Sequence, residues 1–136
     1  MIVVDASAAA ELVLRTPAAP HIDDALQRSR RVIAPVHFDA EVYSTLRRLH
    51  LQRRLDRTRF ELAVDRLQRF DAERLEIVSL LSNVVGLVNV FGAHDVFYVL
   101  LAMSRDCPLL TCDLSLGRAA AAIGVKVIAV DRSRPA

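Results

Sequence analysis

Four carboxylates spread along the chain could carry out chemistry together if the fold brought them to one place: Asp5, Glu41, Asp95 and Asp113. Carboxylates that meet at one site repel one another and shift each other's pKa unless a cation neutralises them. The cation that suits such a set is Mg²⁺ or Mn²⁺, because these hard ions bind oxygen ligands and usually retain waters and substrate phosphates. Bound ions of this kind activate water and stabilise charge on a phosphodiester. The four acids therefore predict metal-dependent hydrolysis of a nucleic-acid backbone.

The positions of the acids along the chain support this prediction. Asp5 and Asp113 each follow a short apolar run typical of a strand and precede a helical pattern. We expect both at the carboxyl edge of a parallel sheet, where ligands bind. Asp95 opens a helix that is apolar on more than one face, and Glu41 lies one turn into another helix, at the edge of its apolar stripe.

Each acid also has an ordinary structural interpretation, which stays open. Asp5, Asp95 and Asp113 could be helix caps or first-turn acids, and Glu41 could pair with a neighbouring Arg. The hydroxyls of Ser7 and Thr111 lie beside the first and last acids in sequence, where they could orient a carboxylate or a metal-bound water. Ordinary cap and strand-end hydrogen bonding is their alternative role.

Arginine dominates the positive charge, accounting for 17 of the 18 Lys and Arg residues in a chain of formal net charge +2. The stretch 47–59 holds six Arg against one Asp, and such a stripe could bind phosphates or form a solvated helix face. The candidates for contact with a nucleic-acid substrate are Arg47, Arg48, Arg53, Arg54 and the isolated Arg118, for which a surface ion pair is the alternative.

The elements that must position these residues alternate between short β-branched runs and longer helical patterns. This alternation predicts an α/β domain with a mainly parallel five-stranded sheet, and 136 residues suit a single domain over 1–136. Strands are expected at 2–4, 32–34, 76–79, 108–111 and 125–130. Helices are expected at 7–14, 21–30, 38–53, 58–70 with Thr58 as N-cap, 81–90, 94–104 and 114–123.

Composition points to an ordinary globular protein of the cytoplasm. Cys107 and Cys112 show no metal-ligand spacing and are expected to be reduced packing residues. The N-terminus lacks the positive region of a secretory signal. The longest apolar stretch, 77–91, is interrupted by polar residues and is shorter than the ~20 residues of a spanning helix, so it indicates buried helix and no membrane segment.

Four sequence blocks that contain the acids occur in order along nearly the whole chain. They are Val-Val-Asp5-Ala-Ser7-Ala, Ala-Pro-Val-His-Phe-Asp-Ala-Glu41-Val, Ala-His-Asp95-Val-Phe-Tyr-Val-Leu-Leu-Ala and Leu-Leu-Thr111-Cys-Asp113. Together these blocks resemble the signature blocks of PIN-domain ribonucleases and, more narrowly, of VapC-type toxins from bacterial toxin–antitoxin modules.

This resemblance implies a three-layer α/β/α sandwich, Mg²⁺- or Mn²⁺-dependent endoribonuclease activity on RNA, a homodimer, and a small VapB-like antitoxin partner whose C-terminal segment occupies the active-site groove. The residues that match the metal-site acids are Asp5, Glu41, Asp95 and Asp113, and those that match the accompanying hydroxyls are Ser7 and Thr111. Some members carry a further acid two residues beyond the last one. This chain has Ser115 there, which favours one metal ion over two.

Three alternatives remain at this point. A receiver-like phosphorylatable signalling domain also binds Mg²⁺, but it usually has two adjacent acids after the first strand and a Lys after the last, whereas here Asp5 stands alone and Lys126 begins the last strand. A phosphatase with an aspartyl nucleophile needs an Asp-x-Asp start, and Ser7 occupies the second position. A catalytically inactive PIN-like module would bind RNA or protein, although the full set of acids argues against it.

Overall fold

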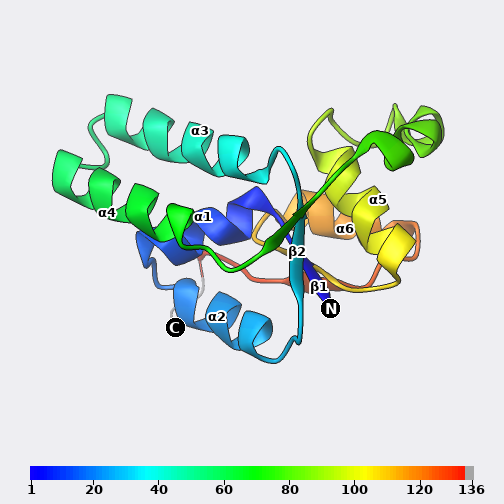
Figure 1. The fold of residues 1–136 in the computed structure, drawn as a ribbon, viewed down its shortest axis with the longest axis horizontal. Helices are drawn as coiled ribbons and strands as arrows, with labels where there is room; N and C mark the ends of the chain where they lie inside the picture. The colour runs from blue at the N-terminus through cyan, green and yellow to red at the C-terminus, as the bar shows by residue number, and fades with distance from the viewer. Residues whose placement is uncertain (134–136) are drawn as a thin grey trace.

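Five short parallel strands form the centre of the structure, a computed structural model that describes residues 1–133 (Figure 1). They are β1 (Ile2–Val4), β2 (Val32–Pro35), β3 (Glu73–Leu75), β4 (Leu109–Thr111) and β5 (Val127–Ala129). The order across the sheet is β3-β2-β1-β4-β5, and every neighbouring pair is parallel. β1 and β4 are wholly buried and apolar up to their ends, as expected for central strands that are covered on both faces.

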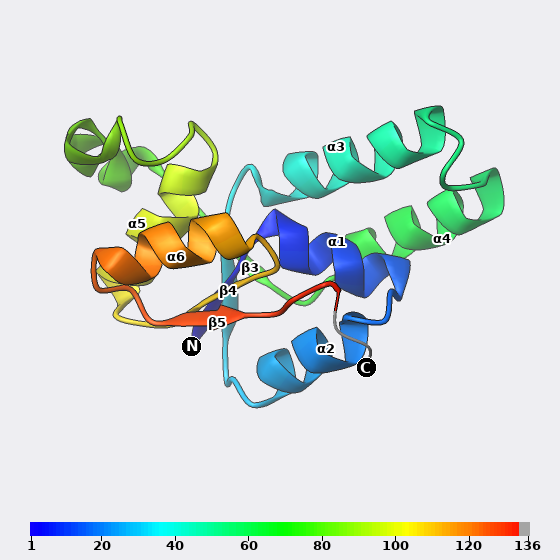
Figure 2. The same cartoon turned by 180° about the vertical axis from the view of Figure 1, so that it is seen from behind.

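Six α-helices surround the sheet within residues 1–133, as Figures 1 and 2 show in outline. They are α1 (Ala6–Leu14), α2 (Ala19–Gln27), α3 (Phe38–Leu51), α4 (Arg57–Gln68), α5 (Asp95–Arg105) and α6 (Leu114–Ala122). α1 to α4 pack on one another, α5 contacts β1 and β2, and α6 contacts β4 and β5. Figures 1 and 2 show the first four helices on one side of the sheet and the last two on the other, the arrangement that right-handed crossovers produce. The predicted α/β/α sandwich is therefore confirmed.

Local sequence explains how several of these helices form. α1, α4 and α6 begin at Asp5, Asp56 and Asp113, whose side chains accept hydrogen bonds from N–H groups in the first turn. On α3, the side chains of Phe38, Val42 and Leu46 lie four residues apart and are fully buried, so this face anchors the helix in the core. The N-cap of α4 is Asp56, and the predicted Thr58 cap is wrong, because the Asp56 carboxylate already accepts the Arg59 N–H at 2.8 Å.

The segment between α4 and α5 differs from the prediction. The third strand lies at 73–75 and not at 76–79, because pairing with β2 sets its position through Ile33↔Glu73 and Ala34↔Arg74. The expected helix over 81–90 is replaced by two short 3₁₀ helices, η1 (Val78–Asn83) and η2 (Val85–Leu87). Val78 and Val85 are 70% and 76% exposed, so the expected burial of this apolar stretch is wrong for these residues.

Cys107 and Cys112 are free and buried. Within residues 1–133, no helix has the length and apolar character needed to cross a membrane.

The strand order creates a distinctive point in the sheet between β1 and β4. From β1 the chain moves outward to β2 and β3, and it then returns to the opposite side of β1 to form β4 and β5. In open α/β sheets, ligands bind beside the carboxyl ends of strands at such a switch point. A receiver domain has the order 2-1-3-4-5, so the observed topology contradicts that alternative.

Candidate functional site

The carboxyl ends of β1 and β4 carry two of the predicted acids. Asp5 caps α1 through the Ala8 N–H at 2.9 Å, and Asp113 caps α6 through the N–H groups of Ser115 and Leu116, both at 3.0 Å. The two strands are neighbours, and the Asp5 N–H donates to the Leu110 carbonyl at 3.1 Å. The cap interpretation is thus correct for both residues. It is compatible with a functional role, because these hydrogen bonds fix both carboxylates at the switch point.

Asp5 is the most enclosed of the four acids, with 3% of its surface exposed. Besides the Ala8 N–H, it accepts hydrogen bonds from the Ser7 hydroxyl at 2.7 Å and from the Thr111 hydroxyl. Burial raises the pKa of Asp5 from 3.8 to about 6, against the opposing effect of these hydrogen bonds. The negative charge of Asp95 makes a smaller contribution to this increase in pKa.

The two predicted hydroxyls form a network that joins the strand ends. The Thr111 side chain, which is fully buried, donates to Asp5, and its oxygen accepts the Asp113 N–H at 2.9 Å. The Ser7 oxygen accepts the Cys112 N–H at 2.9 Å. Ser7 and Thr111 therefore orient the first carboxylate and tie α1 to β4, so their ordinary hydrogen bonds also shape the site.

Asp95 and Glu41 reach the same place from α5 and α3. Asp95 is the first residue of α5 and is partly buried, and burial raises its pKa, with further increases from the charges of Glu41 and Asp113. The Glu41 side chain is 23% exposed, yet its Oε1 atom is buried without a hydrogen-bond partner among the described residues. Oε1 lies 3.1 Å from His37 Nε2, a close contact that lacks hydrogen-bond alignment.

All four predicted acids line one pocket of about 590 Å³. Ser7 also lines this pocket, and Thr111 lies behind Asp5. Of the predicted RNA-binding residues, Arg48 and Arg54 line it, whereas Arg47, Arg53 and Arg118 do not. The structure thus brings together the acids and two of the five arginines.

Three further ionisable residues of this pocket were missed by sequence reasoning: Glu11, Tyr98 and Arg132. Tyr98 lies three residues after Asp95, on the same face of α5, and this spacing could have indicated it. Its pKa is raised by burial and by the charges of Glu41, Asp5 and Asp95. Arg132 follows β5, so the rule that ligands bind at carboxyl ends of strands could have found it.

The oxygen atoms of the site retain capacity to bind a cation. A carboxylate offers about four lone-pair positions, two on each oxygen. The hydrogen bonds of Asp5 use two positions on Oδ1 and one on Oδ2, and those of Asp113 use only Oδ1. Together with the unpartnered Glu41 Oε1, this leaves acceptor positions on three acids that face one pocket.

The arrangement is nevertheless open. Within residues 1–133, no three His, Cys, Asp or Glu side chains lie close enough to form a ready-made metal centre. The donor set therefore fits an ion such as Mg²⁺, which binds through one or two carboxylates and completes its shell with water and substrate phosphates. It does not fit an ion that needs a closed cage of protein ligands, such as structural zinc.

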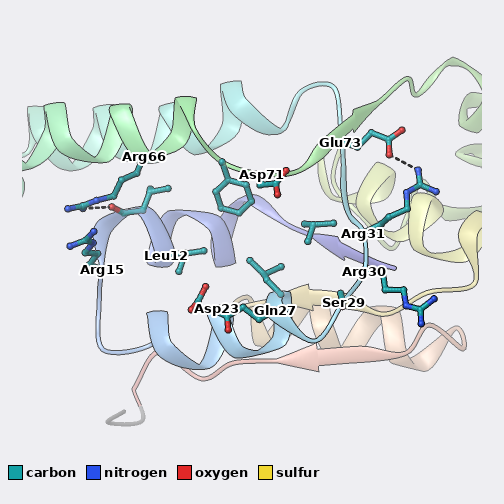
Figure 3. A pocket seen from close by; sticks show the side chains of 14 residues that line it. Leu12, Arg15, Asp23, Gln27, Ser29, Arg30, Arg31, Arg66, Asp71 and Glu73 are labelled. Carbon is teal, nitrogen blue, oxygen red and sulfur yellow. Dashed lines mark hydrogen bonds and ion pairs between the residues drawn. The ribbon is translucent and has the colours of Figure 1, made fainter.

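A larger cavity, of about 720 Å³, lies at the opposite, amino end of β2 and β3 (Figure 3). Its polar groups largely satisfy one another: Arg31 pairs with Glu73, and Arg66 donates to the Val13 carbonyl at 2.8 Å. None of the four predicted acids lines it. A choice of candidate site by cavity size alone would therefore have missed the four carboxylates.

Comparisons with known proteins agree with the geometry. The family model described as PIN domain matches residues 2–122. Three similar proteins come from Mycobacterium tuberculosis. Ribonuclease VapC12 is 34% identical over 113 residues, covering 83% of this chain and 87% of the relative. Ribonuclease VapC9 is 34% identical over 116 residues (85% and 88%), and Ribonuclease VapC3 is 35% identical over 118 residues (87% and 86%).

Proposed function

Because this chain belongs to the PIN domain family, we propose that it is a metal-dependent endoribonuclease that hydrolyses RNA phosphodiester bonds and acts as the toxin of a toxin–antitoxin pair. The observation that carries the proposal is the convergence of Asp5, Glu41, Asp95 and Asp113 on one pocket at the switch point of the sheet. The names of the relatives, which are VapC ribonucleases, support the same activity.

The cofactor in this proposal is Mg²⁺ or Mn²⁺. Negative charge from the neighbouring acids raises the pKa of Asp5 and of Asp95, and a bound cation would relieve this repulsion. The buried Glu41 Oε1 accepts no hydrogen bond among the described residues, so it retains capacity for a cation. When bound, such an ion activates water and stabilises the charge that develops on the phosphodiester. Asp5, Glu41, Asp95 and Asp113 are the residues that would hold it.

The residues of the chain contribute mainly by orientation. Ser7, Thr111 and the Ala8 N–H hold the Asp5 carboxylate in a single position, so it is preorganised before substrate binds. The cap hydrogen bonds of Asp113 occupy Oδ1 and leave Oδ2 to face the pocket. The apolar residues of β1 and β4 beneath these acids are buried, which keeps water away from the base of the site.

The partners in this proposal are single-stranded RNA, a VapB-like antitoxin and a second copy of the chain. RNA follows from the activity, since sequence-specific cleavage usually targets unpaired loops. The antitoxin and the homodimer follow from kinship with VapC proteins, and an antitoxin that filled the carboxylate pocket would block the substrate directly.

The test is cleavage of total RNA by purified protein with Mg²⁺, with Mn²⁺ and with EDTA. We expect cleavage only with the added ions, and we expect Asp5→Asn to abolish it. Asp56→Asn is the matched control, because Asp56 also caps a helix but lies on the exposed N-terminus of α4. Undiminished cleavage in EDTA, or full activity of Asp5→Asn, would refute the proposal. Binding of RNA without cleavage under any of these ions would identify the inactive PIN-like module instead.

A further inference from the structure

The pocket that contains the four acids continues as a groove between α1 and α3. Both helices begin at the carboxyl edge of the sheet, and they lie in contact (Figures 1 and 2). Glu11 on α1 and Arg48 on α3 line the same pocket as Asp5 and Glu41. They lie six and seven residues further along their helices, which places the far end of the groove ~10 Å from the carboxylates at 1.5 Å per residue.

The charge of this groove changes sign along its length. Its near end carries the four acids, and its far end carries Arg48, Arg54 and Arg132. Arg48 follows Glu41 by two helical turns and therefore shares its face of α3. The chain turns sharply after α3 at Arg53, which has a φ of +59°, and the Arg54 N–H then donates to the Leu49 carbonyl at 2.9 Å. This turn brings Arg54 back to the groove.

Arg132 approaches the groove from the opposite wall. The Val130 N–H donates to the Thr111 carbonyl at 2.9 Å, and the Ser133 N–H and hydroxyl donate to Asp131 Oδ1 at 2.9 and 2.7 Å. These contacts hold the chain on both sides of Arg132. Its Nη1 atom lies 3.4 Å from Glu11 Oε1, and its side chain is 56% exposed whereas that of Glu11 is 13% exposed.

Within residues 1–133, the Arg132 guanidinium makes a single long contact, and most of the group is available. The group has five N–H donors in a planar fork that matches the oxygens of a phosphate. The ion pair with Glu11 uses one of them and, at this exposure, holds the side chain only weakly. Arg48 and Arg54 are exposed and make no ion pair within residues 1–133. Three guanidinium groups thus surround one end of a groove whose other end is acidic.

We infer that Arg132, together with Arg48 and Arg54, forms a phosphate-binding subsite that holds a neighbouring phosphate of the RNA strand ~10 Å from the bond that is cleaved. The inference rests on the proposed function and identifies residues that bind the substrate away from the reacting atoms. An acidic groove without these cations would repel the strand that it must accept. The three arginines supply the attraction, and the weak ion pair with Glu11 leaves the Arg132 guanidinium able to turn toward a phosphate.

The test measures binding of a fluorescent single-stranded oligouridine in EDTA, at several salt concentrations, so that no cleavage occurs. Each phosphate contact that is lost should lower the slope of log affinity against log salt by ~0.7 for single strands. We expect Arg132→Ala to lower the slope by this amount and Arg132→Lys to preserve it. Arg105→Ala is the matched control, because Arg105 ends α5 about 15 Å from Asp95, at 1.5 Å per residue.

Steady-state cleavage with Mg²⁺ provides a second measurement. Arg132→Ala should raise KM on the order of tenfold, the effect of losing one charge-assisted hydrogen bond, and leave kcat nearly unchanged. If Arg132→Ala cleaves RNA with the KM and salt slope of the unmodified protein, the inference is wrong while the proposed function stands. If the unmodified protein does not cleave RNA with either ion, the proposed function itself fails.

Discussion

Removing the charge of Asp5 should make the metal-free protein more stable, even though it should abolish cleavage. Asp5 is 3% exposed, and burial raises its pKa from 3.8 to about 6. In the folded protein the ionised form is therefore disfavoured by ~3 kcal/mol relative to the unfolded chain, at 1.36 kcal/mol per pKa unit. Asn has a side-chain oxygen that can cap α1, and it is as good a cap as Asp. Asp5→Asn therefore removes the cost of the buried charge and keeps the cap.

The sign of the pH dependence follows from the same shift. Between pH 3.8 and about 6 the folded protein binds more protons at Asp5 than the unfolded chain does, so this contribution to stability falls as pH rises through that window. Near pH 8 the full penalty of ~3 kcal/mol is present, near pH 5 about half of it remains, and below pH 3.8 it vanishes. The stability advantage of Asp5→Asn should follow this profile.

The assay is urea unfolding in EDTA near pH 8 and near pH 5, followed by circular dichroism. We expect the difference in the free energy of unfolding between Asp5→Asn and the unmodified protein to shrink by about 1.5 kcal/mol between the two pH values. Asp56→Asn changes the same functional group at an exposed helix cap. The free energy of unfolding of this variant should therefore differ little from that of the unmodified protein, and by the same amount at both pH values. If Asp5→Asn is less stable than the unmodified protein at both pH values, by an unchanging amount, the assignment of a buried, destabilising charge is wrong.

Three further perturbations test other parts of the structure. Thr111→Val should lower the free energy of unfolding by ~1–3 kcal/mol and reduce cleavage, because it removes the hydrogen bond to Asp5 Oδ2 and the side-chain acceptor of the Asp113 N–H; Thr111→Ser, which keeps the hydroxyl, should restore both. Mg²⁺ at about 100 times its Kd should stabilise the protein by ~2.7 kcal/mol in thermal unfolding. If Mg²⁺ stabilised Glu41→Gln by the same amount, Glu41 would not be a metal ligand. Leu46→Ala should cost ~2–5 kcal/mol because Leu46 is fully buried, whereas the 47% exposed Leu62 should tolerate the same change with little loss in urea unfolding.

Much of the site could be predicted because the acids lie at element boundaries that local sequence specifies. Asp5 and Asp113 stand between an apolar run and a helical pattern, and both are N-caps as well as pocket residues. Asp95 opens α5, as its position before an apolar helix indicated. At Asp5 and Asp113 one residue type serves two purposes, since a carboxylate both satisfies free N–H groups and can face a ligand at the same sheet edge.

The edge of the sheet was less predictable. The run Ile77-Val78 is more apolar than Glu73-Arg74-Leu75, and local propensity alone therefore favoured it as a strand. In the structure the charged segment forms edge strand β3. Arg74 is held there by Asp39, with distances of 2.7 and 3.0 Å between their nitrogen and oxygen atoms. Edge strands tolerate charge because one side of the strand has no partner in the sheet.

The sequence by itself determined the alternation of strands and helices, the single parallel sheet and the positions of the acids at the ends of elements, because these depend on hydrophobic period and capping within a few residues. Only the tertiary structure decided that β4 returns to lie beside β1, which brings Asp113 to Asp5 across 108 positions of sequence. It also decided which arginines line the groove, selecting Arg48, Arg54 and Arg132. Local preference cannot encode such choices, because strand order and groove walls arise from contacts between segments that are distant in the chain.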